Sequence, residues 1–223
     1  MVHAGFFRMW ATGLAAILAT VLLFATFTTG ARAQEPPCTV VLDPGHGGTD
    51  SRAVNSRYGI TEKDQNLDVA TRLKTLLEND RYSVCMTRTT DKSLSNNERY
   101  TYANTTGASV LVSIHMNGST NTSTDYTTTL FGKWRKDKEL ATTVFDSLST
   151  LPAASGTGTI ATRTPYSFAS GVLLKSDMPA IIAETVFVTN DREGQLLSDG
   201  TGTRQQQIAQ VLMVGIEDYL TTL

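Results

Sequence analysis

The chain of 223 residues has few histidines, few cysteines and no run of basic residues. Nucleic-acid binding needs a basic face that contacts phosphates, so the missing lysine and arginine clusters exclude that class of partner. There are no internal repeats, and the length leaves little room beyond one globular domain. Neither of the two cysteines is adjacent to a basic residue that would activate its thiol, which argues against a cysteine nucleophile.

The first 33 residues are typical of an export signal. Arg8 gives a positive start, residues 10–27 are almost wholly apolar, and Ala31-Arg32-Ala33 matches a small-x-small cleavage site. An uncleaved membrane anchor is the alternative, because the apolar stretch is close to the shortest length that spans a bilayer. We expect residues 1–33 to be a signal peptide, 34–39 a short linker and 40–223 the folded domain, with no stable membrane anchor once the leader is cleaved. The protein would then be exported to the periplasm or the extracellular side of the cell wall.

Cleavage would change the charge and the redox environment of the chain. Loss of Arg8 and Arg32 leaves 17 basic against 21 acidic residues, a net charge of −4. An exported protein meets an oxidising compartment, which favours a disulfide between Cys38 and Cys85 that ties neighbouring strands together. Two separate buried thiols are the alternative.

Apolar runs and helical periodicities alternate along the chain, and this alternation predicts an α/β fold with a mostly parallel sheet. Capping-box patterns at Thr61 and Ser95 mark two helix starts. We expect the segment near residues 127–131 to be an exposed, threonine-rich strand, and the segments 47–59 and 155–164 to be loops. The other expected strands are 38–42, 82–87, 110–114 and 180–188, and the expected helices are 62–78, 95–104, 136–151 and 205–220.

Two of the three histidines remain once His3 is removed with the leader. His46 and His115 each come at the exit of a short buried strand, where open α/β sheets keep their active sites. A catalytic zinc has three protein ligands and one open position, and two histidines with one glutamate form a common set. Glu62, in the first turn of a predicted helix, is the candidate third ligand. The alternative is that Glu62 is a solvated glutamate favoured by the helix dipole.

Glu184 interrupts an otherwise apolar strand, where a charge is costly unless it is paired or functional. It could be a buried carboxylate that pairs with an arginine such as Arg88 or Arg163. It could also be a general base beside a metal, because burial raises and a cation lowers the pKa of such a carboxylate. The second interpretation makes Glu184 the candidate catalytic residue.

Five motifs in register resemble those of the zinc-dependent N-acetylmuramoyl-L-alanine amidases, enzymes that cut peptide stems from the glycan strands of the cell wall. The resemblance covers residues 40–220, nearly the whole mature chain. The motifs are Asp43-Pro44-Gly45-His46-Gly47-Gly48-Thr49-Asp50, Thr61-Glu62-Lys63-Asp64-x-Asn66-Leu67, Thr87-Arg88-x-x-Asp91, Ser113-Ile114-His115-Met116-Asn117 and Pro179-Ala180-x-x-x-Glu184-Thr185-x-Phe187-x-Thr189-Asn190.

The resemblance implies one zinc ion per chain, held by His46, Glu62 and His115, with Glu184 as the catalytic glutamate. It implies a single α/β domain with a roughly six-stranded sheet flanked by helices on both faces, so that residues 40–223 form a zinc amidase catalytic domain. The substrate would be peptidoglycan, cut between N-acetylmuramic acid and L-alanine. The family usually has glycine in place of Val186, and a β-branched residue there disfavours a positive φ and adds bulk beside Glu184.

Two other functions use the same residues or the same surface. A zinc peptidase that cuts within the stem peptide would need the same ligands. An inactive wall-binding module would need only a groove that binds the glycan strand. Retention of both histidines and both glutamates argues against the binding module. Some relatives carry an inserted helix that blocks the zinc until a partner protein removes it. Residues 116–179 show no spare apolar helix of that kind, so we expect an open groove and no partner protein.

Overall fold

A computed structural model describes residues 38–223. The predicted signal peptide and most of the predicted linker lie outside the described residues. From residue 38 onward the chain forms a single α/β domain, as predicted. None of its helices in this range has the length and apolar character needed to cross a membrane.

Six strands form one sheet in the order β4-β1-β5-β8-β6-β7. The first four of these strands are parallel, whereas β6 is antiparallel to β8 and parallel to β7. The predicted mostly parallel, six-stranded sheet is therefore confirmed. The strands are β1 (Val40–Pro44), β4 (Val84–Met86), β5 (Val110–Asn117), β6 (Thr128–Phe131), β7 (Tyr166–Ser167) and β8 (Ala180–Phe187).

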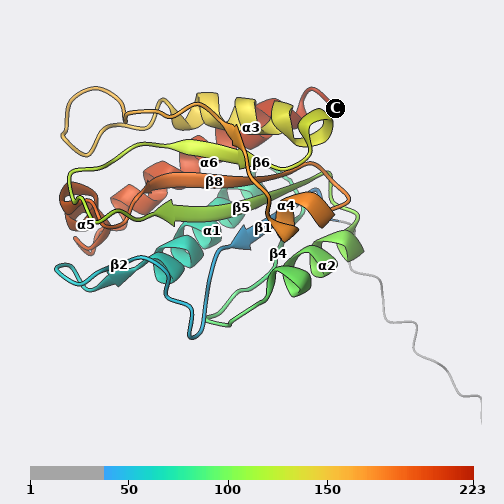
Figure 1. The fold of residues 1–223 in the computed structure, drawn as a ribbon. Coiled ribbons are helices and arrows are strands. Elements are labelled where there is room, and N and C mark those ends of the chain that lie inside the picture. The colour runs from blue at the N-terminus through green and yellow to red at the C-terminus, as the bar shows by residue number, and fades with distance from the viewer. Residues whose placement is uncertain (1–37) are drawn as a thin grey trace, which may run out of the picture. The chain divides into compact units, whose positions relative to one another are not determined.

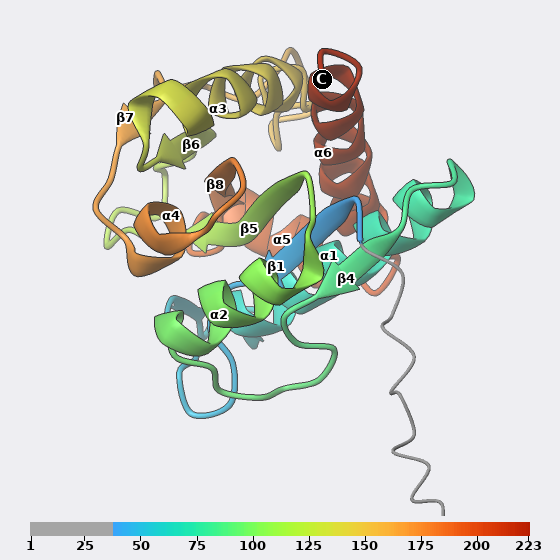
Figure 2. The same cartoon turned by 90° about the vertical axis from the view of Figure 1, so that its right-hand side faces the viewer.

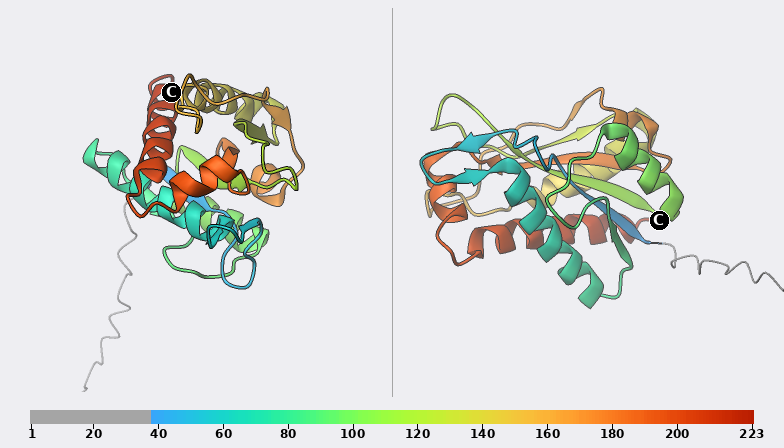
Figure 3. Two further views of the ribbon diagram at one scale, coloured as in Figure 1. Left: turned by 90° about the vertical axis from the view of Figure 1, so that its left-hand side faces the viewer. Right: turned by 90° about the horizontal axis from the view of Figure 1, so that it is seen from below.

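Helices cover both faces of this sheet. On one face, α6 packs against both α1 and α3, and α2 and α4 lie together on the other (Figure 2). The smaller helix α5 lies with the hairpin of β2 (Val54–Asn55) and β3 (Ile60–Thr61) at the end of the sheet toward which β5 points (Figures 1 and 3). The helices are α1 (Glu62–Asn79), α2 (Asn96–Thr106), α3 (Trp134–Leu148), α4 (Gly171–Lys175), α5 (Asp191–Leu197) and α6 (Thr203–Leu220).

Two of these helices begin where the sequence predicts. The Thr61 hydroxyl accepts a hydrogen bond from the backbone N–H of Asp64, which makes Glu62 the first residue of α1. Ser95 and Glu98 form a full capping box at the start of α2, each side chain accepting from the other's backbone N–H. Each cap satisfies N–H groups that the first helical turn leaves without partners.

The two faces of the sheet carry cores of different size. Alternate residues of the central strands, such as Val112 and Ile114 in β5, contact the larger cluster under α1, α3 and α6. The intervening positions, such as Leu111 in β5 and Ile182 in β8, face the smaller cluster under α2 and α4. Because strand residues alternate between faces, only every second side chain of these strands lies on the face that carries the candidate site.

The structure corrects the expectation that the threonine-rich strand is exposed. Thr128 and Thr129 are at most 1% exposed, because β6 lies between β8 and β7 and α3 packs over it. The hydroxyl of Thr129 donates to the carbonyl oxygen of Ala141 in α3 at 2.7 Å, so this polar side chain is satisfied inside the core.

Other sequence expectations also need correction. Strand β5 continues to Asn117, so His115 lies within the strand rather than at its exit. The segment 47–59, expected to be a loop, contains the hairpin strand β2 (Val54–Asn55), and β3 (Ile60–Thr61), α4 and α5 lie in segments for which the sequence predicts no element. These elements have two to seven residues, which is too short for a hydrophobic period to show in the sequence.

Cys38 and Cys85 form a disulfide, with their Cα atoms 5.8 Å apart. The bond joins the residue that leads into β1 to the middle of its neighbour β4, because these two strands are paired in parallel. The predicted bridge between adjacent strands is therefore confirmed.

Candidate metal centre

Because side chains alternate between the two faces along a strand, the candidate residues of β5 and β8 lie on one face of the sheet. In β5, Ser113 and His115 point to the face opposite the larger core, and in β8 Glu184 does the same. His115 and Glu184 are direct partners in the register of β5 and β8. Two residues that are 69 positions apart in the sequence therefore stand side by side.

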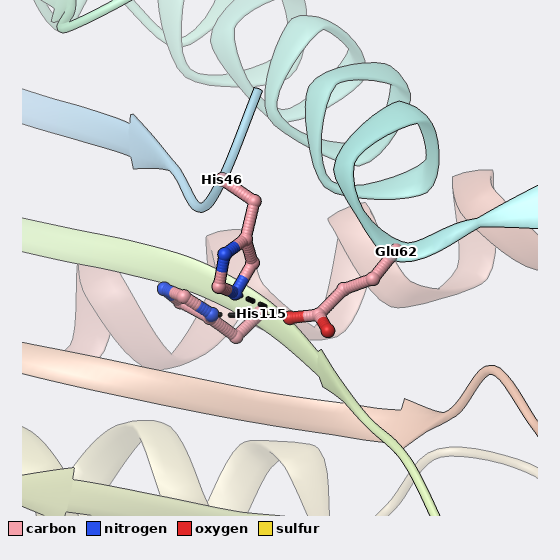
Figure 4. A group of neighbouring side chains, drawn as sticks. All are labelled: His46, Glu62 and His115. Carbon is pink, nitrogen blue, oxygen red and sulfur yellow. Dashed lines mark hydrogen bonds and ion pairs between the residues drawn. The ribbon is translucent and has the colours of Figure 1, made fainter. Parts of the chain in front are cut away.

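Two buried arginines hold the turn that follows β1. Arg88 donates hydrogen bonds to the carbonyl oxygens of Pro44 and Gly45, both at 2.9 Å. Arg99 donates to those of Pro44 at 2.8 Å and His46 at 2.9 Å. His46 itself has a φ of 60°, in the left-handed region that non-glycine residues seldom adopt. The arginines thus fix a strained turn that points the imidazole of His46 toward β5 (Figure 4).

Glu62 is fixed by the start of α1 and by the adjacent hairpin. Its backbone N–H donates to the carbonyl oxygen of Ala53 at 2.8 Å, and its Oε2 accepts from the N–H of Ala53 at 3.2 Å. Burial opposes ionisation of this carboxyl group, which is 3% exposed. Hydrogen bonds and charges of His115 and His46 outweigh burial and lower the pKa of Glu62 to about 2. Glu62 is therefore ionised, as a metal ligand must be.

Three side chains, from the turn after β1, from α1 and from β5, converge on one point (Figure 4). Nε2 of His46 and Nδ1 of His115 each lie 3.1 Å from Oε1 of Glu62, and all three atoms lie within 4.8 Å of one another. In tetrahedral zinc sites with bonds of about 2.0–2.1 Å, neighbouring donor atoms are about 3.3 Å apart. The donor chemistry and the two separations of 3.1 Å therefore fit a zinc ion with one position left for water or substrate.

The second ring nitrogen of His46 also has a partner. Nδ1 of His46 lies 2.7 Å from Oδ2 of Asp50, four residues later in the same loop. This hydrogen bond with His46 lowers the pKa of Asp50. A carboxylate on the far nitrogen of a ligating histidine fixes the orientation of the ring and makes it a stronger ligand. Sequence reasoning does not single out Asp50, although its spacing from His46 within one motif is the signal that could have done so.

Glu184 lies next to the three converging side chains without being one of them. Burial raises the pKa of Glu184, while the nearby His115 lowers it to a smaller extent. Neither Arg88 nor Arg163, the two candidate partners, forms an ion pair or a hydrogen bond with Glu184. Arg88 binds the backbone carbonyls of the turn after β1, and Arg163 stacks over the ring of Tyr166 at 4.6 Å. Glu184 thus combines burial with a position beside the candidate metal ligands, as a proton-transfer residue requires.

A groove of about 840 Å³ opens over these residues. Glu184 and the three converging side chains line it, together with Ala53, Gly118 and Asn96. The groove is large enough for part of a polymer to lie across the site.

The groove is also lined by a buried ion pair that sequence reasoning does not identify. Nη1 of Arg99 and Oδ1 of Asp43 are 2.6 Å apart, and both side chains are at most 5% exposed. Asp43 also accepts hydrogen bonds from the hydroxyls of Ser113 and Thr87. The available signal was the charge of Asp43 directly after the apolar run of β1, the same kind of signal that drew attention to Glu184.

Val186 does not face the groove. It lies within β8, is fully buried in the larger core and does not have a positive φ. The residue that replaces the usual glycine of the family therefore directs its bulk to the opposite face of the sheet from Glu184.

Fold and site together define an α/β domain with a candidate metal centre of two histidines and one glutamate over its parallel strands. A family profile described as N-acetylmuramoyl-L-alanine amidase matches residues 40–218. The chain belongs to the N-acetylmuramoyl-L-alanine amidase family, a family of cell-wall amidases.

Individual relatives are similar to most of this chain. The amidase AmiC of Escherichia coli is 30% identical over 230 residues, covering 85% of this chain and 54% of AmiC. This chain thus spans about half the length of that relative. The uncharacterized protein YqiI of Bacillus subtilis is 31% identical, covering 91% of this chain and 95% of YqiI. Among solved structures, an amidase from Clostridium difficile superposes with a TM-score of 0.73 at 31% identity, over 84% of this chain and 98% of the other.

Proposed function

We propose that this chain is a peptidoglycan hydrolase that cleaves the amide between the lactyl carbonyl of N-acetylmuramic acid and the amine of L-alanine. The proposal assigns zinc, one ion per chain, to His46, Glu62 and His115, and assigns proton transfer to Glu184. Family membership supports the reaction, and the converging donor atoms support the metal. When bound, zinc would act as a Lewis acid that polarises the amide carbonyl and makes water a stronger nucleophile near neutral pH.

The observation that carries the proposal is the position of Glu184 directly opposite His115 in the paired strands. From there its carboxylate accepts a proton from the attacking water and donates it to the nitrogen of the leaving L-alanine. Burial raises its pKa toward the value needed to hold and then release that proton. Ser113, Asp43 and Arg99 keep the floor of the groove rigid, so these groups stay in place during the reaction.

Digestion of purified peptidoglycan tests this function. The protein would be incubated with and without a zinc chelator, and again after zinc is returned, and the soluble products identified by mass spectrometry. An amidase releases intact stem peptides with a free L-alanine amino group and leaves lactyl ends on the glycan. Fragments cut within the stem would instead indicate a zinc peptidase. Wall binding with no released product would indicate an inactive binding module.

We also propose that residues 1–33 are removed and that the enzyme acts in the periplasm or outside the cell. The charged start, apolar stretch and small-x-small site of the leader support this. Amino-terminal sequencing of the exported protein should then begin at Gln34. A mature form that retains the apolar stretch would contradict cleavage and indicate a membrane anchor.

A further inference from the structure

The groove has four acidic side chains and few free positive charges. Asp43, Asp50, Glu62 and Glu184 all line it. Arg99 lines it too, but its guanidinium is buried and bound to Asp43 and to backbone carbonyls. Arg52 is different. Among residues 38–223, its side chain forms neither an ion pair nor a hydrogen bond, although it lines the groove and its charge lowers the pKa of Glu184.

The backbone at Arg52 is strained. Of the described residues other than glycine, three have a positive φ: His46, Arg52 and Arg81. His46 is a candidate metal ligand, and Arg81 follows the last turn of α1, where left-handed residues commonly end helices. Neither reason applies to Arg52, whose φ is 53°. Glycine would adopt this conformation freely, so the arginine side chain is held here against a backbone preference.

The loop also ties Arg52 to the candidate metal centre. The next residue, Ala53, exchanges hydrogen bonds with Glu62 through both its N–H and its carbonyl oxygen. The backbone of Arg52 is therefore one residue away from an anchor on a candidate ligand. Phe168, Ser170 and Val172, which also line the groove, have an aromatic, a polar and an apolar side chain without charge. Among the described residues that line the groove, Arg52 thus carries the positive charge that no ion pair or hydrogen bond engages.

We propose that Arg52 binds the free carboxylate of the second residue of the stem peptide, and so makes the enzyme prefer stems in which this group is not amidated. This inference rests on the proposed function. In the stem, the second residue is a glutamate linked onward through its side chain, which leaves its main-chain carboxylate free unless it is converted to a carboxamide. Standard bond lengths put that carboxylate at most about 6 Å from the scissile nitrogen. An arginine side chain beside the metal centre reaches that far, and its planar fork suits a carboxylate.

The test compares two synthetic glycan strands that carry the same tripeptide stem. They differ only in whether the second stem residue has a carboxylate or a carboxamide. We expect the wild-type protein to cleave the carboxylate form with a kcat/KM about tenfold higher, as one charge-assisted hydrogen bond provides. Arg52→Gln should cleave both forms with similar kcat/KM. Arg52→Gly should behave likewise, and because glycine accepts this φ, the variant controls for any disturbance of the loop by glutamine.

Arg57→Gln is the matched control. Arg57 lies in the turn between β2 and β3, is 69% exposed at its side chain and pairs with Asp191 outside the groove. Removing its charge should leave the preference for the carboxylate unchanged. Equal cleavage of both strands by the wild-type protein, or a preference that survives in Arg52→Gln and Arg52→Gly, would overturn the role of Arg52 while leaving the amidase activity intact. If the wild-type protein cleaves neither strand, the proposed function fails and this inference fails with it.

Discussion

The imidazole ring of His115 lies so close to the backbone of Gly45 that a β-carbon on Gly45 would overlap the ring. The contact joins the turn after β1 to the middle of β5, and the carbonyl oxygen of Gly45 is also held by Arg88. Because Gly45 has no positive φ, its conformation suits any residue. The absence of a side chain, rather than backbone freedom, is what the site requires at this position.

Gly45→Ala should therefore displace His115 and weaken zinc binding roughly 10–100-fold, the range seen when groups that orient a ligand are disturbed. Gly171→Ala is the matched control, because its β-carbon would meet Asn96 at an ordinary 3.4 Å. Zinc affinity of both variants would be measured by competition with a chromogenic chelator. Unchanged affinity in Gly45→Ala would show that the ring can move aside without loss.

Glu184→Gln keeps the shape of the side chain but cannot accept a proton. If Glu184 moves the proton, the variant should retain zinc and its melting temperature while losing about 10²–10⁴-fold in turnover. Loss of zinc would instead make Glu184 a ligand, and a lower melting temperature alone would make it a structural residue. Near-normal turnover by the zinc-loaded variant would falsify the proposed mechanism.

Asp50→Asn removes the charge that holds Nδ1 of His46. Its zinc affinity should fall by about 10–100-fold, because the ring becomes a weaker and less well oriented ligand. Asp68→Asn removes a carboxylate of the same charge from the exposed side of α1, where it pairs with Arg72, and should bind zinc as the wild type does. Equal affinities in the two variants would show that the hydrogen bond between His46 and Asp50 does not support the metal.

The buried Asp43 makes stability depend on pH. Burial opposes its ionisation, but Arg99 and hydrogen bonds from Ser113 and Thr87 outweigh it and lower the pKa of Asp43 below 3.8. The unfolded chain therefore binds a proton at Asp43 more readily than the folded chain does. The stabilisation that Asp43 provides above pH 4 is lost as the pH falls through its folded-state pKa.

Urea unfolding at several pH values between 3 and 7 would measure this effect. The free energy of unfolding of the wild type should fall below pH 4, and Asp43→Asn should show a shallower fall. The variant should also be about 3–5 kcal/mol less stable at pH 7, because Arg99 is left buried without its partner. Parallel pH profiles for the two proteins would argue against Asp43 as the titrating group.

The Cys38–Cys85 disulfide closes a long loop, since the two residues are 47 positions apart. In the chain-entropy account, removing it should lower the free energy of unfolding by up to about 4 kcal/mol. The double variant with serine at both positions would be compared with the oxidised wild type by chemical unfolding. Equal stability would mean that the bridge restrains the unfolded chain far less than its loop length implies.

The sequence predicts the parts of this structure that local rules control. The caps at Thr61 and Ser95, the long amphipathic helices and the apolar central strands all lie within two or three residues of their expected positions. The candidate ligands His46 and His115 could be named because a chain with so few histidines places them beside buried strands. Glu62 could be named only as an alternative until the family motifs were considered.

The remaining features depend on contacts between distant segments. Burial of Thr128 and Thr129 follows from the position of β6 between two other strands, and strand order cannot be read from a local pattern. The Asp43–Arg99 pair joins residues 56 positions apart. A hydrogen bond from Arg99 holds the strained turn at His46, and the strained backbone at Arg52 precedes Ala53, which is bonded to Glu62.

The unequal division of the core between the two faces of the sheet bears on how the enzyme could diversify. The larger cluster, under α1, α3 and α6, contains most of the buried apolar residues, while the groove shares its face with the smaller cluster. Substitutions along the groove walls therefore disturb little of the packing on which folding depends. In such a scaffold, residues that contact the substrate can change during evolution without unfolding the domain, because the packing on the opposite face keeps it folded.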